Sequence, residues 1–472
     1  MSLIIPANSA SAASGYQVAN SCRFDDGDSA YMTKTPDSAG NRDRWTFSTW
    51  TKRGNLSGEY QTIISASGGS ADDTDYFYFN ADNTLHVHLV ASGSAYGTLY
   101  TNRKFRDISS WYNIILVYDS GNGTAGDRLI MYINGVRETS FSASSFPDQN
   151  ADSVMTLGSG GIDVGRDGSS SGSGYLDGYL AETVLIDGLA LDATSFGEFD
   201  DSGIWKPIDV SGLTFGTNGF YLDFEASDNL GNDANGGTDF TEVNLAATDQ
   251  ATDTPTNNFC TLNPLVPDAQ ASSEGNTKFT NSSGANWRVA LSTIAPSAGK
   301  WYCEIKITEI GGGSQIGVAD MNNLPASLAT DIGSGSWSWS YNSSDGNKRH
   351  SAGNGGSSFG NSFTTNDIIG IAMDLDNNKL YFSKNGTWQN SGDPTTGSTG
   401  TGSAFDLDAG GAYAFGFTSN DTGTDPVLDI NYGNPSFAIS SGNTDGDGYG
   451  NFEYAVPSGY FSLNTKNLAE YG

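Results

Sequence analysis

The sequence has few cysteine and histidine residues, with three of each among its 472 residues. The cysteines, Cys22, Cys260 and Cys303, are far apart and show no C-x-x-C spacing, so we expect neither a zinc site nor a disulfide framework. Three histidines also leave little material for a Ser-His-Asp triad, and the sequence has no G-x-S-x-G motif.

Basic residues are scarce as well. The chain has 22 Lys and Arg against 54 Asp and Glu, and its formal net charge is -32. Such a charge repels phosphate backbones and anionic lipid headgroups, so we expect no nucleic-acid partner. No stretch approaches the ~18 apolar residues of a membrane helix, which predicts no membrane insertion. The start "MSLIIPANSASAASG" lacks a basic region and is a poor secretory signal.

Glycine, aromatic residues and short alternating runs are abundant. The chain has 61 Gly and 12 % aromatic residues, and Ser, Thr, Asn and Asp separate its apolar runs. The run "RWTFSTWTKR" alternates with the period of two that is typical of a strand, and "WYNIILVYD" is apolar on both faces, as in a central strand. This composition predicts an all-β protein, and its length predicts two or three domains.

Two stretches roughly 250 residues apart have the same pattern. "RLIMYING" and "KLYFSKNG" each begin with a basic residue, alternate apolar and polar positions and end in Asn-Gly. Asn134-Gly135 and Asn385-Gly386 supply the positive φ angles of a type I′ hairpin turn. The repeated pattern is either the same structural position in two copies of one architecture or convergence on one kind of turn.

The predicted organisation has four parts: an N-terminal arm at residues 1–15, a first sandwich at 16–225, an irregular linker at 226–297 that packs on a neighbouring domain, and a second sandwich with a C-terminal extension at 298–472. A short helix is predicted only at residues 192–200, with Asp192 or Thr194 as its cap.

The two halves each resemble a known family. "WTFSTW", "WYNIILVYD", "DRLIMYINGVRE" and "GYLAETVLIDGLAL" resemble a concanavalin A-like, laminin-G-type jelly roll, while "GKWYCEIKI", "DIIGIAMDLDNNKLYFSKNGTW" and "VLDINYGNPSF" resemble a SPRY domain. The resemblance implies two antiparallel β-sandwich domains joined by a packed linker.

The chain as a whole resembles tail or virion-surface proteins of tailed bacteriophages. This likeness rests on "IIPANSASAASGYQVANSCRF", "TDQATDTPTNNFCTLNPL" and "PSGYFSLNTKNLAE". It implies a homo-oligomeric structural protein on the virion surface, a tail fibre or tail-associated protein assembled in the cytoplasm of the bacterial host. The N-terminal arm would contact other virion proteins, and the sandwiches would bind a host glycan or receptor. A capsid or tail decoration protein is the alternative, and a polysaccharide-degrading enzyme is the least favoured.

The sequence argues against glycosidase chemistry. Glucanases of the concanavalin-like fold use an E-x-D-x-x-E strand, because two carboxylates must lie about 5 Å apart. The nearest match is "EFDDSG" at residues 198–203, which lacks the third acid and lies in the predicted helix. We therefore expect no enzymatic activity.

The candidate ligand-binding residues lie in "SGSWSWSYNSSDGNKRH". They are Trp339, Tyr341, Asn342, Asp345 and Arg349. Aromatic platforms beside amide and carboxylate groups are typical of sugar sites. The resembling SPRY domains bind partners through loops at one end of the sandwich, near which this span would lie. If the span is a strand, Trp337, Trp339 and Tyr341 share one face and form an aromatic stripe, and the alternative is that this stripe faces the sandwich core.

Calcium is the only cofactor that the sequence favours. In "NTDGDGYGNFEY" Asn443, Asp445 and Asp447 stand at calcium-loop positions, although Tyr454 replaces the final Glu, and a glycine-rich surface loop is the alternative. His86 and His88 in "TLHVHLV" could form half a metal site. Alternatively, Leu85, Val87 and Leu89 take the core face and leave both imidazoles on the outer or concave face.

Overall fold

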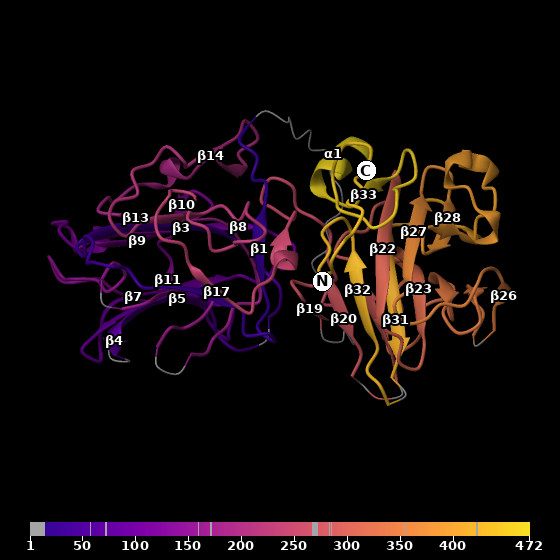
Figure 1. The fold of residues 1–472 in the computed structure, drawn as a ribbon, viewed down its shortest axis with the longest axis horizontal. Helices are drawn as coiled ribbons and strands as arrows, with labels where there is room; N and C mark the ends of the chain where they lie inside the picture. Colours follow the sequence, from indigo (N-terminus) through magenta and orange to yellow (C-terminus); the bar gives the residue numbers. More distant parts are fainter. Residues whose placement is uncertain are drawn as a thin grey trace. The chain divides into compact units, whose positions relative to one another are not determined.

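The computed structural model describes residues 15–56, 58–70, 73–158, 160–169, 172–266, 272–282, 284, 286–353, 355–421 and 423–472. These form two compact units, the N-terminal unit (residues 15–256) and the C-terminal unit (residues 257–472). Each unit is built of layered antiparallel sheets (Figure 1), which confirms the all-β class. Apart from Gly15, the predicted arm lies outside the described residues.

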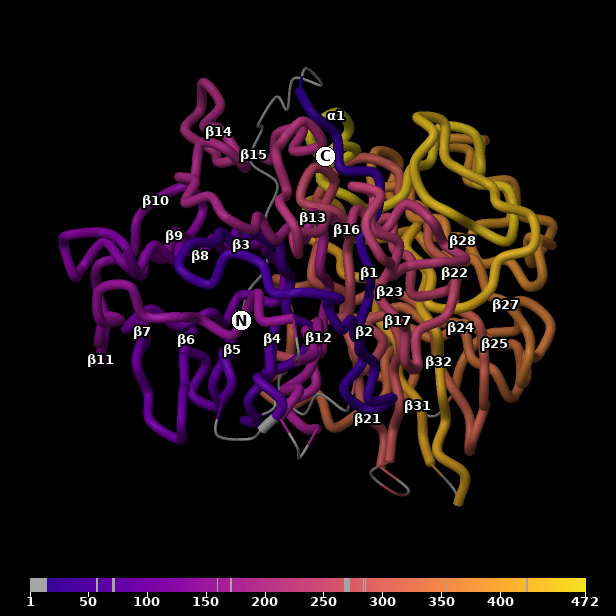
Figure 2. Tube along the Cα trace, turned by 60° about the vertical axis from the view of Figure 1, so that its left-hand side comes forward, coloured from indigo at the N-terminus to yellow at the C-terminus, as the bar shows by residue number. Residues whose placement is uncertain are grey.

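The N-terminal unit contains two large sheets. One, the covered sheet, has the order β10-β9-β8-β3-β13-β1-β18, with β16 beside β13. The other, the open sheet, has the order β11-β7-β6-β5-β4-β12-β2-β17, and Figure 2 shows these strands side by side.

The strands of the covered sheet are β1 (Ser21–Phe24), β3 (Arg44–Arg53), β8 (Tyr112–Asp119), β9 (Leu129–Ile133), β10 (Val136–Arg137), β13 (Gly178–Asp187), β16 (Phe220–Leu222) and β18 (Gln250–Ala251). Those of the open sheet are β2 (Tyr31–Lys34), β4 (Gln61–Ser70), β5 (Asp73–Phe79), β6 (Thr84–Ala91), β7 (Ser94–Lys104), β11 (Phe141–Ser145), β12 (Ile162–Val164) and β17 (Thr241–Val243). A separate hairpin joins β14 (Gly197–Phe199) to β15 (Trp205–Pro207).

The covered sheet is buried on both of its faces. Ile114 and Leu116 of β8 pack into the core between the two sheets, whereas Ile115 and Val117 pack into a second cluster on the opposite face. This second cluster includes Trp205 from the β14–β15 hairpin. The central strand predicted from "WYNIILVYD" is therefore confirmed. Because both faces of the covered sheet are buried, polar side chains are expected on the outer face of the open sheet.

The two Asn-Gly hairpins occupy equivalent positions. β3, β8, β9 and β10 are neighbours in that order, as are β22, β27, β28 and β29 in the C-terminal unit. Asn134 and Asn385 have φ angles of 48° and 47°, and the glycine after each has 75°. Each Asn Oδ1 also accepts a hydrogen bond of 2.8 Å from a backbone N–H at the start of the neighbouring strand, that of Asn113 in β8 or of Ile368 in β27. The two hairpins therefore take the same place in the strand order of the two units, as predicted.

The C-terminal unit also consists of two packed sheets. The first, in the order β19-β20-β32-β22-β27-β28-β29 with β30 and β33 attached, comprises β19 (Ser272–Ser273), β20 (Lys278–Thr280), β22 (Lys300–Glu309), β27 (Ile368–Asp374), β28 (Lys379–Lys384), β29 (Thr387–Trp388), β30 (Phe405–Asp406), β32 (Val427–Asn431) and β33 (Phe461–Ser462). The second comprises β21 (Trp287–Leu291), β31 (Tyr413–Asn420), β23 (Ser314–Asp320), β24 (Ser338–Asn342), β25 (Asn347–Arg349) and β26 (Ser357–Ser358), in that spatial order.

The segment predicted as a linker, residues 226–297, is divided between the units. β17 and β18 extend the two sheets of the N-terminal unit, and β19, β20 and β21 belong to the C-terminal unit. These strands have two to five residues, too few to display the alternation by which a strand is recognised in a sequence.

Helical structure is limited. Residues 192–200, predicted as a helix, form a 3-10 turn at Ala193–Ser195 capped by Asp192, followed directly by β14. A helix that was not predicted, α1 (Thr465–Tyr471), begins after its cap Asn464, which accepts a hydrogen bond from the Asn467 N–H. The other 3-10 turns are Ala125–Asp127, Ala247–Asp249, Met321–Asn323, Gln389–Ser391 and Pro394–Thr399. Among the described residues no helix is long and apolar enough to cross a membrane.

Candidate functional site

The outer face of the open sheet carries a group of aromatic rings. We call it the tyrosine–histidine face, and its members are Tyr60, Tyr76, Tyr78, His86, His88 and Tyr100. They stand there because the alternate residues of β6, Leu85, Val87 and Leu89, point into the sandwich core. The predicted placement of both imidazoles outside the core is confirmed, and their use as half a metal site stays a prediction.

One row of this face crosses three strands. Tyr78 of β5, His86 of β6 and Tyr100 of β7 are direct cross-strand neighbours. The His86 and Tyr100 rings are stacked, with centroids 3.8 Å apart and 9° between their planes. Tyr78 lies 5.2 Å from His86 on the other side, and its hydroxyl is 3.2 Å from His86 Nδ1. The three rings form a continuous strip across the sheet.

A second row continues the aromatic surface. Tyr76 lies opposite His88, with ring centroids 5.5 Å apart, and the Tyr100 hydroxyl is 3.2 Å from His88 Nδ1. Tyr60 extends the face at the start of β4, since its ring is 5.7 Å from Tyr78. The four tyrosines and His88 are half-buried, so part of each ring remains open to solvent.

The rings are uncharged at neutral pH. Burial lowers the pKa of His86 to about 4, with a smaller contribution from the neighbouring His88, and burial also lowers the pKa of His88. Burial raises the pKa of Tyr76 and Tyr100. The face therefore offers neutral rings with polar edges, although the chain as a whole is strongly acidic.

Charged groups border the face next to Tyr60. The Tyr60 hydroxyl lies 2.6 Å from Ser173 Oγ and donates a longer bond of 3.4 Å to Asp167 Oδ2. Arg166 donates to Asp163 at 2.8 Å, and its guanidinium lies 3.5 Å from the centre of the Tyr31 ring. Neutral rings bordered by carboxylate, hydroxyl and guanidinium groups can stack on a ring-shaped ligand and bond its hydroxyls.

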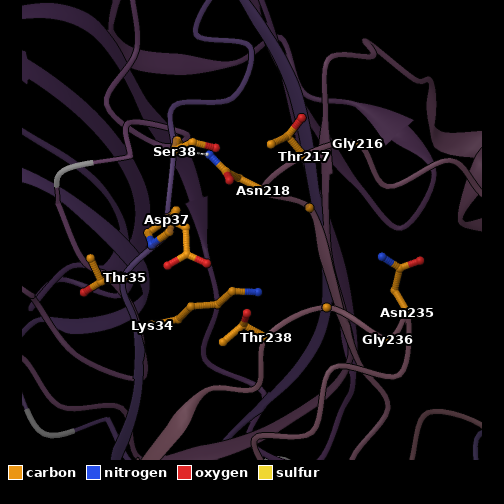
Figure 3. A pocket seen from close by; sticks show the side chains of 13 residues that line it. Lys34, Thr35, Asp37, Ser38, Gly216, Thr217, Asn218, Asn235, Gly236 and Thr238 are labelled. Atoms are coloured by element: carbon orange, nitrogen blue, oxygen red, sulfur yellow. Dashed lines mark hydrogen bonds between the residues drawn. The ribbon is translucent and has the colours of Figure 1, made fainter.

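The N-terminal unit also has a small polar pocket (Figure 3). Its volume is about 280 Å³, and Lys34, Asp37, Asn218 and Thr238 are among its lining residues. Two of these side chains are engaged within the protein, because Lys34 pairs with Asp233 at 3.4 Å and Asn218 Nδ2 donates to the carbonyls of Ser38 and Thr156.

Comparison with known families agrees with the architecture of both units. Residues 25–193 match the model of the concanavalin A-like lectin/glucanases superfamily, and residues 300–401 match that of the SPRY domain. The chain contains a concanavalin A-like domain and a SPRY domain. Domains of these kinds bind carbohydrate or protein, which indicates a binding function.

Similar proteins cover parts of the chain. "Ran-binding proteins 9/10 homolog" of Drosophila melanogaster is 34% identical over 112 residues, 22% of this chain and 11% of that protein. Ran-binding protein 9 of Homo sapiens is 33% identical over 103 residues, 21% of this chain and 13% of that protein. The chain thus spans a small part of the length of these relatives.

Two solved structures are similar in part. The SPRY domain of human HERC1 is 20% identical, with a TM-score of 0.26, over 33% of this chain and 87% of that chain. The heptameric SAP-like pentraxin of Limulus polyphemus is 15% identical, with a TM-score of 0.26, over 38% of this chain and 74% of that chain.

The SPRY domain buries the two aromatic residues predicted to bind ligand. Trp339 is 2% exposed and stacks on His350, and Tyr341 is fully buried and donates to the Asn361 carbonyl. Both belong to the core between the two sheets of the C-terminal unit. Trp339 and Tyr341 therefore face the sandwich core, which was the alternative interpretation of the stripe. The prediction that these two rings lie on a binding surface is wrong. Trp337, expected on the same face, lies before β24 and packs in a different cluster.

The other three predicted residues form a turn. Asn342 is buried and its Oδ1 accepts from the Ser344 N–H and Oγ. Asp345 is exposed and receives a hydrogen bond of 3.1 Å from Arg349, whose side chain is largely buried. The turn is held together by its own bonds, and its ligand-binding role stays a prediction.

The predicted calcium residues lie beyond the part that matches the SPRY model. Asp445 Oδ1 accepts from the backbone N–H groups of Asp447 and Tyr449, and its Oδ2 accepts from Ser462 and from Asn467 Nδ2. Asn443 Nδ2 donates within the same loop, and Asp447 is exposed. Asp445 thus ties this loop to α1, and its bonds account for its burial without a cation.

The sequence offered one signal for the tyrosine–histidine face. "YFYFN" alternates two tyrosines with two phenylalanines, so both tyrosines had to share a face. Their assembly with His86 and Tyr100 depends on the pairing of three strands, which the alternation alone does not give.

Proposed function

We propose that this protein is a structural component of a tailed-bacteriophage virion, displayed on the particle surface as a tail fibre or tail-associated protein. In this proposal the tyrosine–histidine face of the concanavalin A-like domain binds a glycan of the host cell surface. The role is binding, without catalysis. The N-terminal arm, which lies outside the described residues, would hold the protein to other virion proteins.

The observation that carries the glycan proposal is the row Tyr78, His86 and Tyr100. Three rings from adjacent strands are locked by stacking and by a hydrogen bond, so little side-chain entropy is lost when a ligand covers them. Neutral rings also suit an uncharged sugar better than an anionic partner, which the net charge of -32 would repel. The virion part of the proposal rests on the sequence likeness to phage proteins.

A glycan array with the full-length chain tests the binding site. The variant Tyr100→Ala removes the ring that stacks on His86, and we expect at least a tenfold loss of binding to any glycan that the wild type retains. This corresponds to about 1.4 kcal/mol, within the range found for removing an aromatic contact.

The matched control is Tyr449→Ala, since Tyr449 is also half-buried but lies in the C-terminal unit, beside Lys466. It should bind like the wild type. Equal binding by Tyr100→Ala and the wild type would refute the assigned face, and an array with no retained glycan would refute the ligand class.

A second candidate function, virion decoration by subunit contacts alone, has its own structural support. Phe199 and Ile204 of the β14–β15 hairpin are each about half exposed, and Val136 of β10 is 57% exposed. Trp205 links them, because it contacts the Phe199 ring and lies against Gly135. An apolar patch of this kind is typical of a protein contact surface.

The location of the chain in a cryo-EM reconstruction of the intact particle distinguishes the two candidates. Projecting copies with the tyrosine–histidine face turned to solvent would support host attachment. Copies on capsid symmetry axes, with Phe199 and Ile204 buried against a neighbour, would make decoration the primary role.

A further inference from the structure

Three segments of the N-terminal unit meet around the small polar pocket (Figure 3). They are residues 34–38, which begin at the end of β2, residues 216–219, which directly precede β16, and residues 235–238, which lie between β16 and β17. The Asn218 N–H donates to Asp187 Oδ2 at the end of β13, at 2.9 Å, and the Asn218 side chain donates to the Ser38 carbonyl. These bonds join the first two segments to each other and to the covered sheet. None of the lining residues belongs to the tyrosine–histidine face.

Lys34 brings a buried ammonium group to this pocket. Its side chain is 7% exposed, and its Nζ lies 5.4 Å and 5.9 Å from the centres of the Phe240 and Phe220 rings. Among the described residues Lys34 Nζ donates one hydrogen bond, of 3.4 Å to Asp233 Oδ2, which is longer than the about 2.7–2.9 Å typical of a charge-assisted bond. An ammonium group has three N–H donors, so two of them have no acceptor within the described part of the chain. An oxygen atom of a ligand in the pocket can accept these bonds.

The Asp233 carboxylate is held in place and leaves the Lys34 ammonium open to the pocket. Asp233 Oδ1 accepts hydrogen bonds from the backbone N–H groups of Tyr221 and Asn235, at 3.0 Å and 3.1 Å. A Cβ at Gly237 would lie 2.3 Å from Asp233 Oδ2 and 3.8 Å from Lys34 Nζ, so a side chain there would fill the space beside the ion pair. The glycine thus keeps the ion pair accessible to a ligand.

Asp37 and Asn218 add two hydrogen-bond acceptors to the lining of the pocket. Asp37 is exposed, and its carboxylate forms no ion pair or hydrogen bond with any described residue, Lys34 included. Asn218 Nδ2 donates to the carbonyls of Ser38 and Thr156, whereas no described group donates to Asn218 Oδ1. The pocket therefore presents a positive group, a negative group and a neutral acceptor that the protein itself does not connect.

We propose that this pocket binds the zwitterion of a small α-amino acid, with the ligand carboxylate on Lys34 and the ligand ammonium on Asp37 and Asn218 Oδ1. A volume of about 280 Å³ lies just below the ~300–1,000 Å³ of pockets for drug-sized ligands, so a molecule of a few heavy atoms fits. A simple anion would be repelled by Asp37, and a simple cation would be repelled by Lys34. A zwitterion satisfies both groups and, having no net charge, is not repelled by the net charge of -32.

Isothermal titration of the full-length chain with glycine, L-alanine and L-serine tests the proposal. We expect saturable binding with a Kd of about 1 mM or below. N-acetylglycine lacks the ammonium group and glycinamide lacks the carboxylate, so each loses one charge-assisted bond and should bind at least tenfold more weakly than glycine. Glycerol is the probe for a neutral polyol and should also bind at least tenfold more weakly.

Two variants remove the charges that face the ligand. Asp37→Asn changes an exposed side chain, and the double variant Lys34→Met with Asp233→Asn removes both members of the ion pair, so that no buried charge is left alone. The control is Asp148→Asn, which removes an exposed carboxylate of the same unit that does not line the pocket. Thermal unfolding followed by circular dichroism checks that each variant is folded.

Both test variants should weaken glycine binding at least tenfold, while Asp148→Asn keeps the wild-type affinity. If the double variant does not fold, the affinity of Asp37→Asn decides. Absence of binding by the wild type up to about 10 mM amino acid, unchanged affinity in Asp37→Asn, or loss of binding in Asp148→Asn would each overturn the proposal. Binding of N-acetylglycine, glycinamide or glycerol as tightly as glycine would overturn the ligand class.

Discussion

Glu182 offers a sharp test of the electrostatics of the N-terminal unit. It lies in a bulge of β13 between Ala181 and Val184, has a positive φ of 47° and is 5% exposed. Its carboxylate accepts hydrogen bonds from the hydroxyls of Tyr221, at 2.8 Å, and Tyr16. Burial outweighs these bonds and raises its pKa from 4.5 to about 7.

The sign of the pH dependence follows from proton binding. The folded protein keeps the Glu182 proton up to about pH 7, whereas the unfolded chain releases it near pH 4.5. The stabilising contribution is therefore complete below pH 4.5 and is lost as the pH rises through 7. At about 1.4 kcal/mol for each tenfold difference in proton affinity, the loss is about 3 kcal/mol.

Glu182→Gln mimics the protonated side chain, so it should match the wild type near pH 4 and exceed its free energy of unfolding by about 3 kcal/mol near pH 8. Urea unfolding of both proteins between these pH values, followed by tryptophan fluorescence, measures the difference. Glu198→Gln, at an exposed position of β14, is the control and should show no such trend. A difference between Glu182→Gln and the wild type that is constant, or that shrinks as the pH rises, would refute the reasoning.

Three further substitutions have expected outcomes. Trp339→Ala should lower the free energy of unfolding of the SPRY domain by about 3–5 kcal/mol in urea unfolding, because it empties a buried site, and should leave any glycan binding unchanged. Asp445→Ala should cost about 3 kcal/mol in the same assay, since it leaves Ser462 and Asn467 without their acceptor; an unchanged stability would show that the loop is not tied to α1. Gly386→Ala should cost more than Gly410→Ala by differential scanning calorimetry, because both have positive φ but a Cβ at Gly386 would meet the Tyr454 ring at 2.6 Å while Gly410 faces open space. Equal effects would contradict this last argument.

Local patterns in the sequence predicted local structure well. Asn-Gly at 134–135 and 385–386 sufficed to place two type I′ turns, because that turn needs positive φ at both positions. The alternation in "TLHVHLV" correctly separated core residues from His86 and His88. In both cases the information lies within a few residues of chain.

The candidate sites depended on contacts that no local pattern contains. The stripe of Trp339 and Tyr341 had to share a face, but alternation does not tell which face is buried. Tyr78, His86 and Tyr100 meet only through the pairing of β5 with β6 and of β6 with β7. The short helix α1 was within reach of the sequence, because Asn464 is a strong capping residue before "TKNLAEY".

The paired Asn-Gly turns also set a limit on the chemical lifetime of the protein. In an Asn-Gly sequence the glycine nitrogen can attack the asparagine side-chain carbonyl and expel ammonia, and water then opens the resulting succinimide ring to aspartate or isoaspartate. The hydrogen bonds that Asn113 and Ile368 donate to Oδ1 hold each side chain in the turn and restrain this attack. Isoaspartate would add a backbone atom at the tip of the hairpin and disturb the register of β9 with β10, or of β28 with β29. Mass spectrometry of stored protein can follow deamidation at these two hairpins separately from the other Asn-Gly pairs of the chain, at 122–123, 218–219, 235–236 and 354–355.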